Sequence, residues 1–150
     1  MLNDIYALSY ISIALEEFDE PKLKALAQHA IQKNKRLDIS GYLCFMHNMF
    51  FQYLEGSKTE VVDLMNEIEM DIRHQVINLI HFGSIKERKF LGWSMRYLDD
   101  GELSSIHLED MLNWIFTSMQ TEDIPLALLK EKVHIMVDQI KTLRGNKTIN

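Results

Sequence analysis

The sequence predicts an α+β fold followed by two further helices. Two observations lead to this class. Five short segments rich in β-branched and aromatic residues are typical of strands, and four longer segments place apolar residues at helical spacing. With 150 residues, 47% of them hydrophobic and 25% charged, the chain can bury the core of one domain with an appendage.

The first strand is expected at residues 4–13 and the first helix at residues 19–36. Asp19 is a suitable N-cap for this helix, Pro21 suits its first turn, and basic residues fall at its end. The apolar residues of the helix form one stripe at helical spacing, which comprises Leu23, Leu26, Ala27, Ala30 and Ile31.

Residues 40–47 and 49–56 predict two strands joined at Asn48, which form a hairpin. Because side chains alternate along a strand, Phe50 and Gln52 lie on the same face of the second one. A buried amide such as Gln52 must be hydrogen-bonded, or it destabilises the fold. Its partner is therefore either another part of the protein or a ligand.

The segment "SKTE" predicts a capping box that begins a second helix at Ser57, and this helix runs to about Ile72. Two more strands are expected at residues 75–85 and 90–98, the latter with a break near Gly92. The element order is then β-α-β-β-α-β with a fifth strand, the ferredoxin-like pattern. Both helices of such a unit cover one face of the sheet.

The C-terminal part predicts two helices, at residues 104–120 and roughly 124–143, with Pro125 in the first turn of the second. They would either cover the other face of the sheet or form an oligomer interface, and the sequence leaves both open. We therefore divide the chain into a domain at residues 1–100 and a helical segment at residues 101–150.

Composition excludes several classes of protein. The net charge of −6 argues against a nucleic-acid partner. The single cysteine, Cys44, excludes a disulfide framework and favours a reducing compartment, so we expect a cytoplasmic protein. We expect no signal peptide, because an acidic residue and no basic region lie near the N-terminus, and no apolar run reaches transmembrane length.

Motifs for enzymatic chemistry are missing from the sequence. It contains no phosphate-binding glycine loop, no HExxH motif, no zinc-spaced cysteine and histidine cluster and no G-x-S-x-G elbow. We therefore expect neither an enzyme nor a metal site.

Five segments, taken together, resemble one known family. They are "ALSY" with Tyr10, "NKRLDISGYL" with Asn34, "FFQYLEG" with Gln52, "DIRH" with Asp71, Arg73 and His74, and "RKFLGWSM" with Trp93 and Met95. Over roughly residues 3–98 the chain is similar to the BLUF domain, a blue-light sensor that holds a flavin. The fold of that family agrees with the element order expected above.

The resemblance implies a flavin bound non-covalently between the two helices of the unit. The residues that it places around the flavin are Tyr10, Leu26, Ile31, Asn34, Phe50, Gln52, Ile68, Asp71, Arg73 and His74. Blue light would drive transfer of an electron and a proton from Tyr10, and Gln52 would be left rotated or tautomerised. The response would reach Trp93 and Met95, then the C-terminal helices, a homo-oligomer contact and a downstream protein partner.

Two positions depart from the family pattern. Lys33 stands where relatives often carry His or Asn, and Glu67 stands where some relatives have a basic residue on the phosphate side of the flavin. The family's habit favours FAD, while FMN and riboflavin remain open. The direction in which Trp93 points is also open.

Three other functions compete with the sensor. A non-photoactive ferredoxin-like ligand-binding or interaction module is the main alternative, and the combination of Tyr10 with Gln52 argues against it. A flavin enzyme is disfavoured because no acid-base set accompanies a substrate pocket. An RNA-binding sheet is disfavoured by the net charge and by the lack of a paired aromatic signature.

Overall fold

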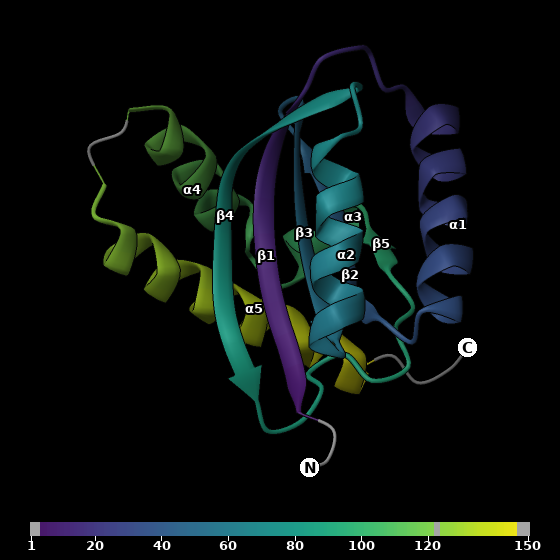
Figure 1. Ribbon diagram of the computed structural model, residues 1–150. Helices are drawn as coiled ribbons and strands as arrows, with labels where there is room; N and C mark the ends of the chain where they lie inside the picture. Colours follow the sequence, from purple (N-terminus) through teal and green to yellow (C-terminus); the bar gives the residue numbers. More distant parts are fainter. Residues whose placement is uncertain (1–3, 122–123, 147–150) are drawn as a thin grey trace. The chain divides into compact units, whose positions relative to one another are not determined.

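The computed structural model describes residues 4–121 and 124–146. The chain divides into two compact units, Met1–Leu98 and Asp99–Asn150. The first unit contains a five-stranded sheet and two helices, and the second contains the remaining helices (Figure 1).

The first unit has the expected β-α-β-β-α-β order with a fifth strand. Its elements are β1 (Ile5–Ala14), α1 (Glu20–Arg36), β2 (Ser40–Met46), β3 (Met49–Gly56), α2 (Lys58–Glu69), β4 (His74–Ile85) and β5 (Arg96–Leu98). The strand order is β4-β1-β3-β2-β5, in which β5 pairs parallel to β2 and all other neighbours are antiparallel. Helices α1 and α2 lie on one face of this sheet (Figure 1), so the predicted fold class is confirmed.

The helix starts follow from local capping. The Asp19 side chain accepts a hydrogen bond from the Lys22 amide at 3.0 Å, and proline occupies the first turn of α1. The Ser57 side chain likewise accepts from the Glu60 amide at 3.4 Å at the start of α2. Among the described residues the reciprocal bond, from the Ser57 amide to the Glu60 carboxylate, is absent, so only half of the predicted capping box forms.

Helix α2 ends earlier than expected, at Glu69 rather than near Ile72. The reason is a turn centred on Asp71, whose side chain accepts from the Arg73 amide at 3.0 Å. Such side-chain bonds compete with helical ones and stop the helix. This early stop places Asp71 and Arg73 at the end of the space between the two helices.

The hairpin between β2 and β3 turns over two residues rather than at Asn48 alone. His47 and Asn48 have φ values of 53° and 65°, as a tight hairpin turn requires. The turn fixes the register, in which Met46 lies opposite Met49 and Leu43 lies opposite Gln52. Leu43 and Gln52 therefore lie on the face that α1 and α2 cover.

The last strand is much shorter than the predicted 90–98, since β5 has only three residues. Gly92 and Met95 have φ values of 94° and 68°, which take the backbone out of the extended conformation. The Trp93 carbonyl accepts from the amides of Gly41, at 2.9 Å, and Met95, at 2.8 Å. Trp93 and Met95 thus precede the strand, contrary to the expectation that they lie on it.

The second unit consists of α3 (Asp100–Ser105), α4 (Glu109–Thr121) and α5 (Leu126–Asn146). Helices α4 and α5 contact each other and correspond to the two expected helices. The short α3 was not predicted, although Asp99 and Glu102 form a complete capping box at its start. Within the described ranges, no helix is both long enough and apolar enough to cross a membrane.

Candidate functional site

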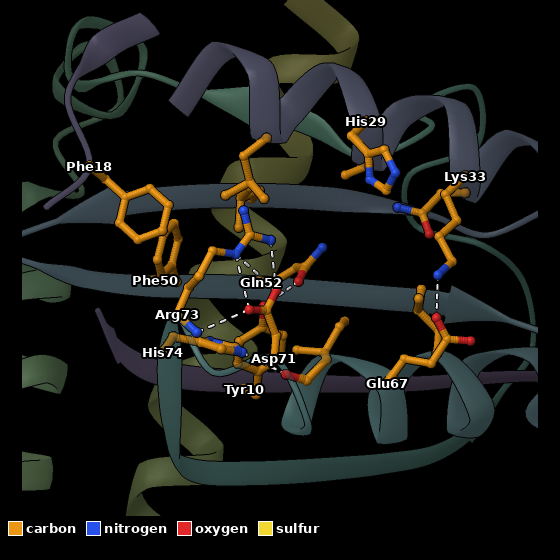
Figure 2. A pocket seen from close by; sticks show the side chains of 16 residues that line it. Tyr10, Phe18, His29, Lys33, Phe50, Gln52, Glu67, Asp71, Arg73 and His74 are labelled. Carbon is orange, nitrogen blue, oxygen red and sulfur yellow. Dashed lines mark hydrogen bonds and ion pairs between the residues drawn. The ribbon is translucent and has the colours of Figure 1, made fainter. Parts of the chain in front are cut away.

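A cavity of about 230 Å³ lies in the first unit, bounded by α1, α2 and one face of the sheet (Figure 2). A single water needs only about 10–15 Å³, so this cavity has room for an organic ring system. Its walls combine apolar side chains with a few polar ones, as in most ligand sites. The lining residues are Tyr10, Phe18, Leu26, His29, Ala30, Lys33, Asn34, Leu43, Phe50, Gln52, Leu64, Glu67, Ile68, Asp71, Arg73 and His74.

Tyr10 and Gln52 meet at the floor of the cavity. They are direct partners across β1 and β3, so both side chains point to the same face. Both residues are buried, and the Tyr10 hydroxyl donates a hydrogen bond to Gln52 Oε1. The Gln52 amide nitrogen has no hydrogen-bond partner among the described residues, and Figure 2 shows it directed away from Tyr10.

Burial raises the pKa of the Tyr10 phenol above its usual range, and the negative charge of Asp71 raises that pKa further. Tyr10 therefore keeps its proton at neutral pH. A protonated phenol can donate but a phenolate cannot, so the direction of the bond from Tyr10 to Gln52 is fixed.

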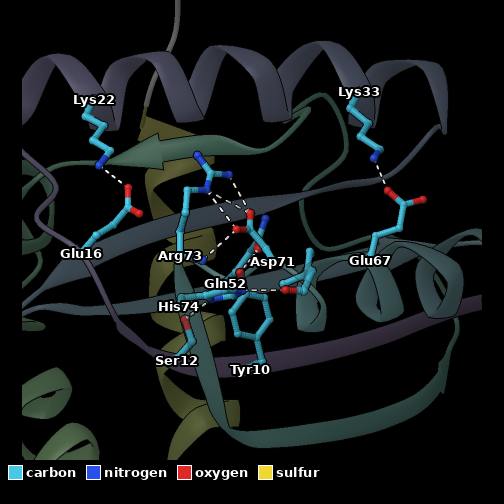
Figure 3. A network of polar contacts seen from close by, with 11 residues as sticks. Tyr10, Ser12, Glu16, Lys22, Lys33, Gln52, Glu67, Asp71, Arg73 and His74 are labelled. Atoms are coloured by element: carbon cyan, nitrogen blue, oxygen red, sulfur yellow. Dashed lines mark hydrogen bonds and ion pairs between the residues drawn. The ribbon is translucent and has the colours of Figure 1, made fainter.

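Asp71 and Arg73 form an ion pair at one end of the cavity (Figure 3). Arg73 Nε lies 3.0 Å from Asp71 Oδ1, and Arg73 Nη2 lies 2.7 Å from Asp71 Oδ2. This hydrogen bonding lowers the pKa of Asp71 to about 2. The carboxylate is thus ionised at neutral pH, and both side chains are held at the cavity.

His74 connects the end of α2 to β1. Its Nε2 lies 2.6 Å from the Ile68 carbonyl oxygen, and its Nδ1 lies 2.7 Å from Ser12 Oγ. A carbonyl only accepts, so Nε2 carries a hydrogen, and the Ser12 hydroxyl donates to Nδ1 when the imidazole is neutral. The ring also contacts Tyr10 edge-on, with centroids 6.1 Å apart.

On the cavity wall formed by α1, Asn34 supplies a buried polar atom that has no hydrogen-bond partner among the described residues. It lies in the last turn of α1, is only 2% exposed, and its Oδ1 has no hydrogen-bond partner. A buried amide oxygen without a partner destabilises the protein unless a ligand donates to it. Asn34 Oδ1 and the Gln52 amide nitrogen thus offer one acceptor and one donor to a ligand.

This donor and acceptor set fits the isoalloxazine ring of a flavin. That ring has flat apolar faces and an edge that carries carbonyl oxygens and an imide N–H. Leu26 and Ile68 line opposite helical walls of the cavity, and Phe50 lines its floor. Asn34 would accept from the imide N–H, and Gln52 would donate to an acceptor of the ring.

Of the ten residues expected around the flavin, Ile31 alone is missing from the described cavity lining, and Trp93 and Met95, which were expected to relay the response, are missing from it as well. Ile31 packs against the buried core beside it. Trp93 stacks on Phe90 with ring centroids 5.3 Å apart, whereas Met95 is fully buried in the core cluster that includes Tyr10. Met95 therefore lies in the core, whereas the Trp93 ring lies against Phe90 and outside the cavity lining.

Several lining residues were not foreseen from the sequence, namely Phe18, His29, Ala30, Leu43 and Leu64. Leu43 could have been found, because the hairpin turn fixes its place opposite Gln52. His29 could also have been found, since it lies one helical turn before Lys33. Phe18 follows β1 in a loop, and no sequence periodicity gives its position.

A second polar network holds the segment that leads to Trp93. The buried Glu55 carboxylate accepts from the Ser40 hydroxyl at 2.8 Å and from the Tyr53 hydroxyl at 3.1 Å. It also accepts from the amides of Lys89, at 2.8 Å, and Phe90, at 2.7 Å. Glu55 lies three residues after Gln52 on β3, so one strand contacts both the cavity and this segment.

In the residues that the structure describes, no group of three or more His, Cys, Asp or Glu side chains is placed to hold a metal ion.

Comparison with known proteins gives the same family that the sequence resembles. The family model described as "Sensors of blue-light using FAD" (BLUF) matches residues 5–96. The photoactivated adenylate cyclase subunit beta of Euglena longa is 32% identical over an alignment of 124 residues, and the match covers 79% of this chain and 14% of that protein. The chain thus spans only a small part of this curated relative.

Two solved structures are also similar. The structure of a bacterial light-regulated adenylyl cyclase has 26% identity and a TM-score of 0.65, and the match covers 78% of this chain and 34% of the cyclase. The dark-state structure of BlrB, a BLUF protein, has 23% identity and a TM-score of 0.70, and covers 95% of this chain and 98% of BlrB. The latter likeness is evidence for the fold alone.

Proposed function

Because the chain belongs to the BLUF family of flavin-binding blue-light sensors, we propose that residues 1–100 form a photoreceptor and that residues 101–150 carry its output. The observation that carries this proposal is the hydrogen bond from Tyr10 to Gln52 at a cavity where Asn34 Oδ1 has no partner. If Tyr10 and Gln52 served only to stabilise the fold, neither the cavity nor the unpaired Asn34 acceptor would be required.

The cofactor is a flavin, and FAD is our choice because the family description names it. When bound, the flavin supplies absorption of blue light and accepts an electron. Leu26 and Ile68 would hold its ring from the two helices, and Asn34 and Gln52 would hold the polar edge. FMN and riboflavin carry the same ring, so these contacts do not distinguish the three.

Tyr10 is the electron donor in this proposal. Loss of an electron makes a phenol strongly acidic, so the Tyr10 proton would move along the existing hydrogen bond to Gln52 Oε1. Gln52 would then carry the proton on oxygen, or rotate and exchange its donor and acceptor ends. Return of one electron and one proton restores Tyr10, so no substrate is consumed.

The polar network beyond Gln52 offers a route to the output. Gln52 and Glu55 lie on β3, and Glu55 holds the amides of Lys89 and Phe90. Trp93 stacks on Phe90. A changed Gln52 would therefore shift β3 and, through Glu55, the segment that ends the first unit.

For the output we propose protein contacts, either with a second copy of this chain or with a downstream partner. Relatives are named as photoactivated adenylate cyclase subunits, but this chain matches only 14% of such a protein. Helices α4 and α5 are candidates for the contact surface, because each also carries large hydrophobic side chains that are exposed, Trp114 on α4 and Leu126 and Ile135 on α5.

An absorption spectrum in the dark and then under blue light tests the proposal. We expect a flavin spectrum with a small reversible red shift. Gln52→Leu should retain the flavin but lose the shift, and Tyr10→Phe should lose the normal photocycle. A flavin spectrum that does not shift in the wild type, or a Gln52→Leu variant that shifts normally, would contradict the mechanism. A protein that binds no flavin would favour the interaction module.

A further inference from the structure

The end of helix α1 is closed by a Schellman motif that lacks its usual glycine. The Ile39 amide donates to the Asn34 carbonyl at 2.9 Å, and the Asp38 amide donates to the Lys35 carbonyl at 3.3 Å. Asp38 has a φ of 56°, the left-handed conformation that glycine adopts most readily. The turn that fixes the last turn of α1, with Asn34 in it, is therefore less favourable on its own than a glycine turn would be.

A side chain from a distant segment supports this turn. Arg88 lies between β4 and β5, and its Nη2 donates to the Asp38 carbonyl at 2.8 Å and to Asp38 Oδ2 at 3.2 Å. Its Nη1 donates to Ser40 Oγ at 3.0 Å, at the start of β2. The Arg88 side chain is only 14% exposed, and hydrogen bonds from an ionised donor are stronger than neutral ones. Arg88 therefore holds both sides of the turn.

The same short segment is also bonded to β3. The two amides that follow Arg88 in the chain donate to the buried Glu55 carboxylate. Residues 88–90 are thus bonded to the end of α1, which carries Asn34, and to β3, which carries Gln52. Asn34 and Gln52 are the two residues that offer polar atoms to the edge of a ligand ring.

Asn34 depends on this turn for its direction. Its Oδ1 has no hydrogen-bond partner among the described residues, so the direction of this atom follows the backbone of α1. A loosened helix end would move the acceptor that Asn34 offers. A hydrogen bond weakens steeply once its donor and acceptor are misaligned, so a small movement of the helix end would be felt by the ligand.

We propose that Arg88 is a positioning residue for the flavin, which holds the turn between α1 and β2 and thereby aims Asn34 Oδ1 at the imide N–H of the ring. Arg88 is not among the described residues that line the cavity, so it acts through Asn34. By reciprocity, a change at the ring edge reaches residues 88–90 through Asn34 as well as through Gln52. This inference rests on the proposed function, in which the flavin ring occupies the cavity.

Equilibrium dialysis of the full chain against FAD in the dark tests this role by a double-mutant cycle. Arg88→Met should weaken FAD binding about fivefold, because one neutral hydrogen bond to the ring is misaligned. In an Asn34→Ala background the same change should alter the affinity less than about twofold, since the bond that Arg88 supports is already gone. In a Gln52→Leu background the effect of Arg88→Met should persist at full size.

Two further measurements test the turn directly. Asp38→Gly, added to Arg88→Met, should restore most of the lost affinity, because glycine adopts the left-handed conformation without support. The Asp38 side chain is 92% exposed, so its removal leaves the core unchanged. Infrared spectra of the bound flavin should show carbonyl bands shifted in the same direction in Arg88→Met and in Asn34→Ala, which a mere loss of stability would not produce.

Lys86→Met is the matched control. Lys86 carries the same charge on the same connection between β4 and β5, but it is exposed. This variant should keep the wild-type affinity, which separates the role of Arg88 from a simple effect of charge on an anionic cofactor. If Arg88→Met does not fold, Arg88→Lys takes its place in the cycle, since lysine keeps the charge but lacks the two-nitrogen fork.

Equal weakening of FAD binding by Arg88→Met in the wild-type and Asn34→Ala backgrounds would overturn the inference while the photoreceptor stands, because Arg88 would then act on the fold as a whole. An unchanged affinity in Arg88→Met would overturn it as well. Failure of the wild type to bind FAD would overturn the proposed function and the inference with it.

Discussion

The hydrogen bond from Tyr10 to Gln52 can be tested without light, by a double-mutant cycle on stability. The wild type, Tyr10→Phe, Gln52→Leu and the double variant are compared, and their free energies of unfolding are obtained from urea denaturation without added flavin. Both side chains are buried, with exposures of 4% and 5%, so neither has ready access to bulk water once its partner is removed.

Tyr10→Phe removes the donor and leaves Gln52 Oε1 buried without a partner. Such an unsatisfied group costs about 1–3 kcal/mol, so we expect destabilisation of about 1–2 kcal/mol, since the cavity lets some water reach the amide. In the Gln52→Leu background the Tyr10 hydroxyl is itself unpaired. The same Tyr10→Phe change should then be neutral or stabilising, because it removes a buried polar group that has lost its partner.

The coupling energy between the two sites is therefore expected to be at least about 1 kcal/mol. Far-UV circular dichroism follows the unfolding, and equal urea dependence in all four proteins shows that the unfolded states are comparable. Additivity within about 0.5 kcal/mol would refute the reasoning, because it would mean that the two side chains do not interact in solution.

Two further predictions concern pH and the backbone. Asp71 has its pKa lowered to about 2 from 3.8, so its contribution to stability is present above about pH 4 and is lost as the pH falls toward 2. With a third of the side chain exposed, screening reduces that contribution to about 1 kcal/mol, so urea denaturation should show the gap between wild type and Asp71→Asn closing over this range; a constant gap would contradict it. Gly41 has φ +150°, and a Cβ there would lie 1.8 Å from the Tyr53 carbonyl oxygen, so Gly41→Ala should abolish folding, as judged by soluble yield and thermal melting. Gly83→Ala, with φ +83° and nothing within 4 Å, is the control and should cost only about 1 kcal/mol; equal effects would show that the close contact is unimportant.

Elements determined by local chemistry could be predicted from the sequence. Helix α1 begins where Asp19 can cap it, and the hairpin forms where two strand-like segments meet at a turn residue. The short α3, which was not predicted, also begins at a local capping motif. Its capping residues Asp99 and Glu102 have the D-x-x-E spacing, but with only six residues the helix is too short to show an apolar periodicity of its own.

Elements determined by distant contacts could not be predicted. Residues 90–98 have the composition of a strand, yet Met95 adopts a left-handed backbone conformation that its side chain does not favour. The hydrogen bond from the Gly41 amide of β2 to the Trp93 carbonyl, in the loop before β5, contributes to holding this conformation. The amino-acid composition indicates strand propensity, but it does not reveal the hydrogen bond between Gly41 and Trp93.

The candidate site, too, combines features that the sequence predicts with features that depend on distant contacts. Strand alternation alone showed that Gln52 needs a partner, but the family resemblance was required to connect it with Tyr10 and Asn34. The positions of Phe18 and His29 at the cavity depend on how the loop and α1 lie on the sheet. The pairing of Lys33 with Glu67 joins residues 34 positions apart on separate helices, which no local spacing predicts.

The shortness of β5 has a consequence for how firmly its region is held. Strand β1 is bonded along its length to β3 and β4, whereas β5 has three residues and one neighbour, β2. Amide hydrogens in β5 should therefore exchange with solvent through local opening that leaves the central strands intact. The first unit thus combines a rigid frame around Tyr10 and Gln52 with a last strand that opens at low cost. A displacement of one side chain can then alter the end of the unit without unfolding its centre.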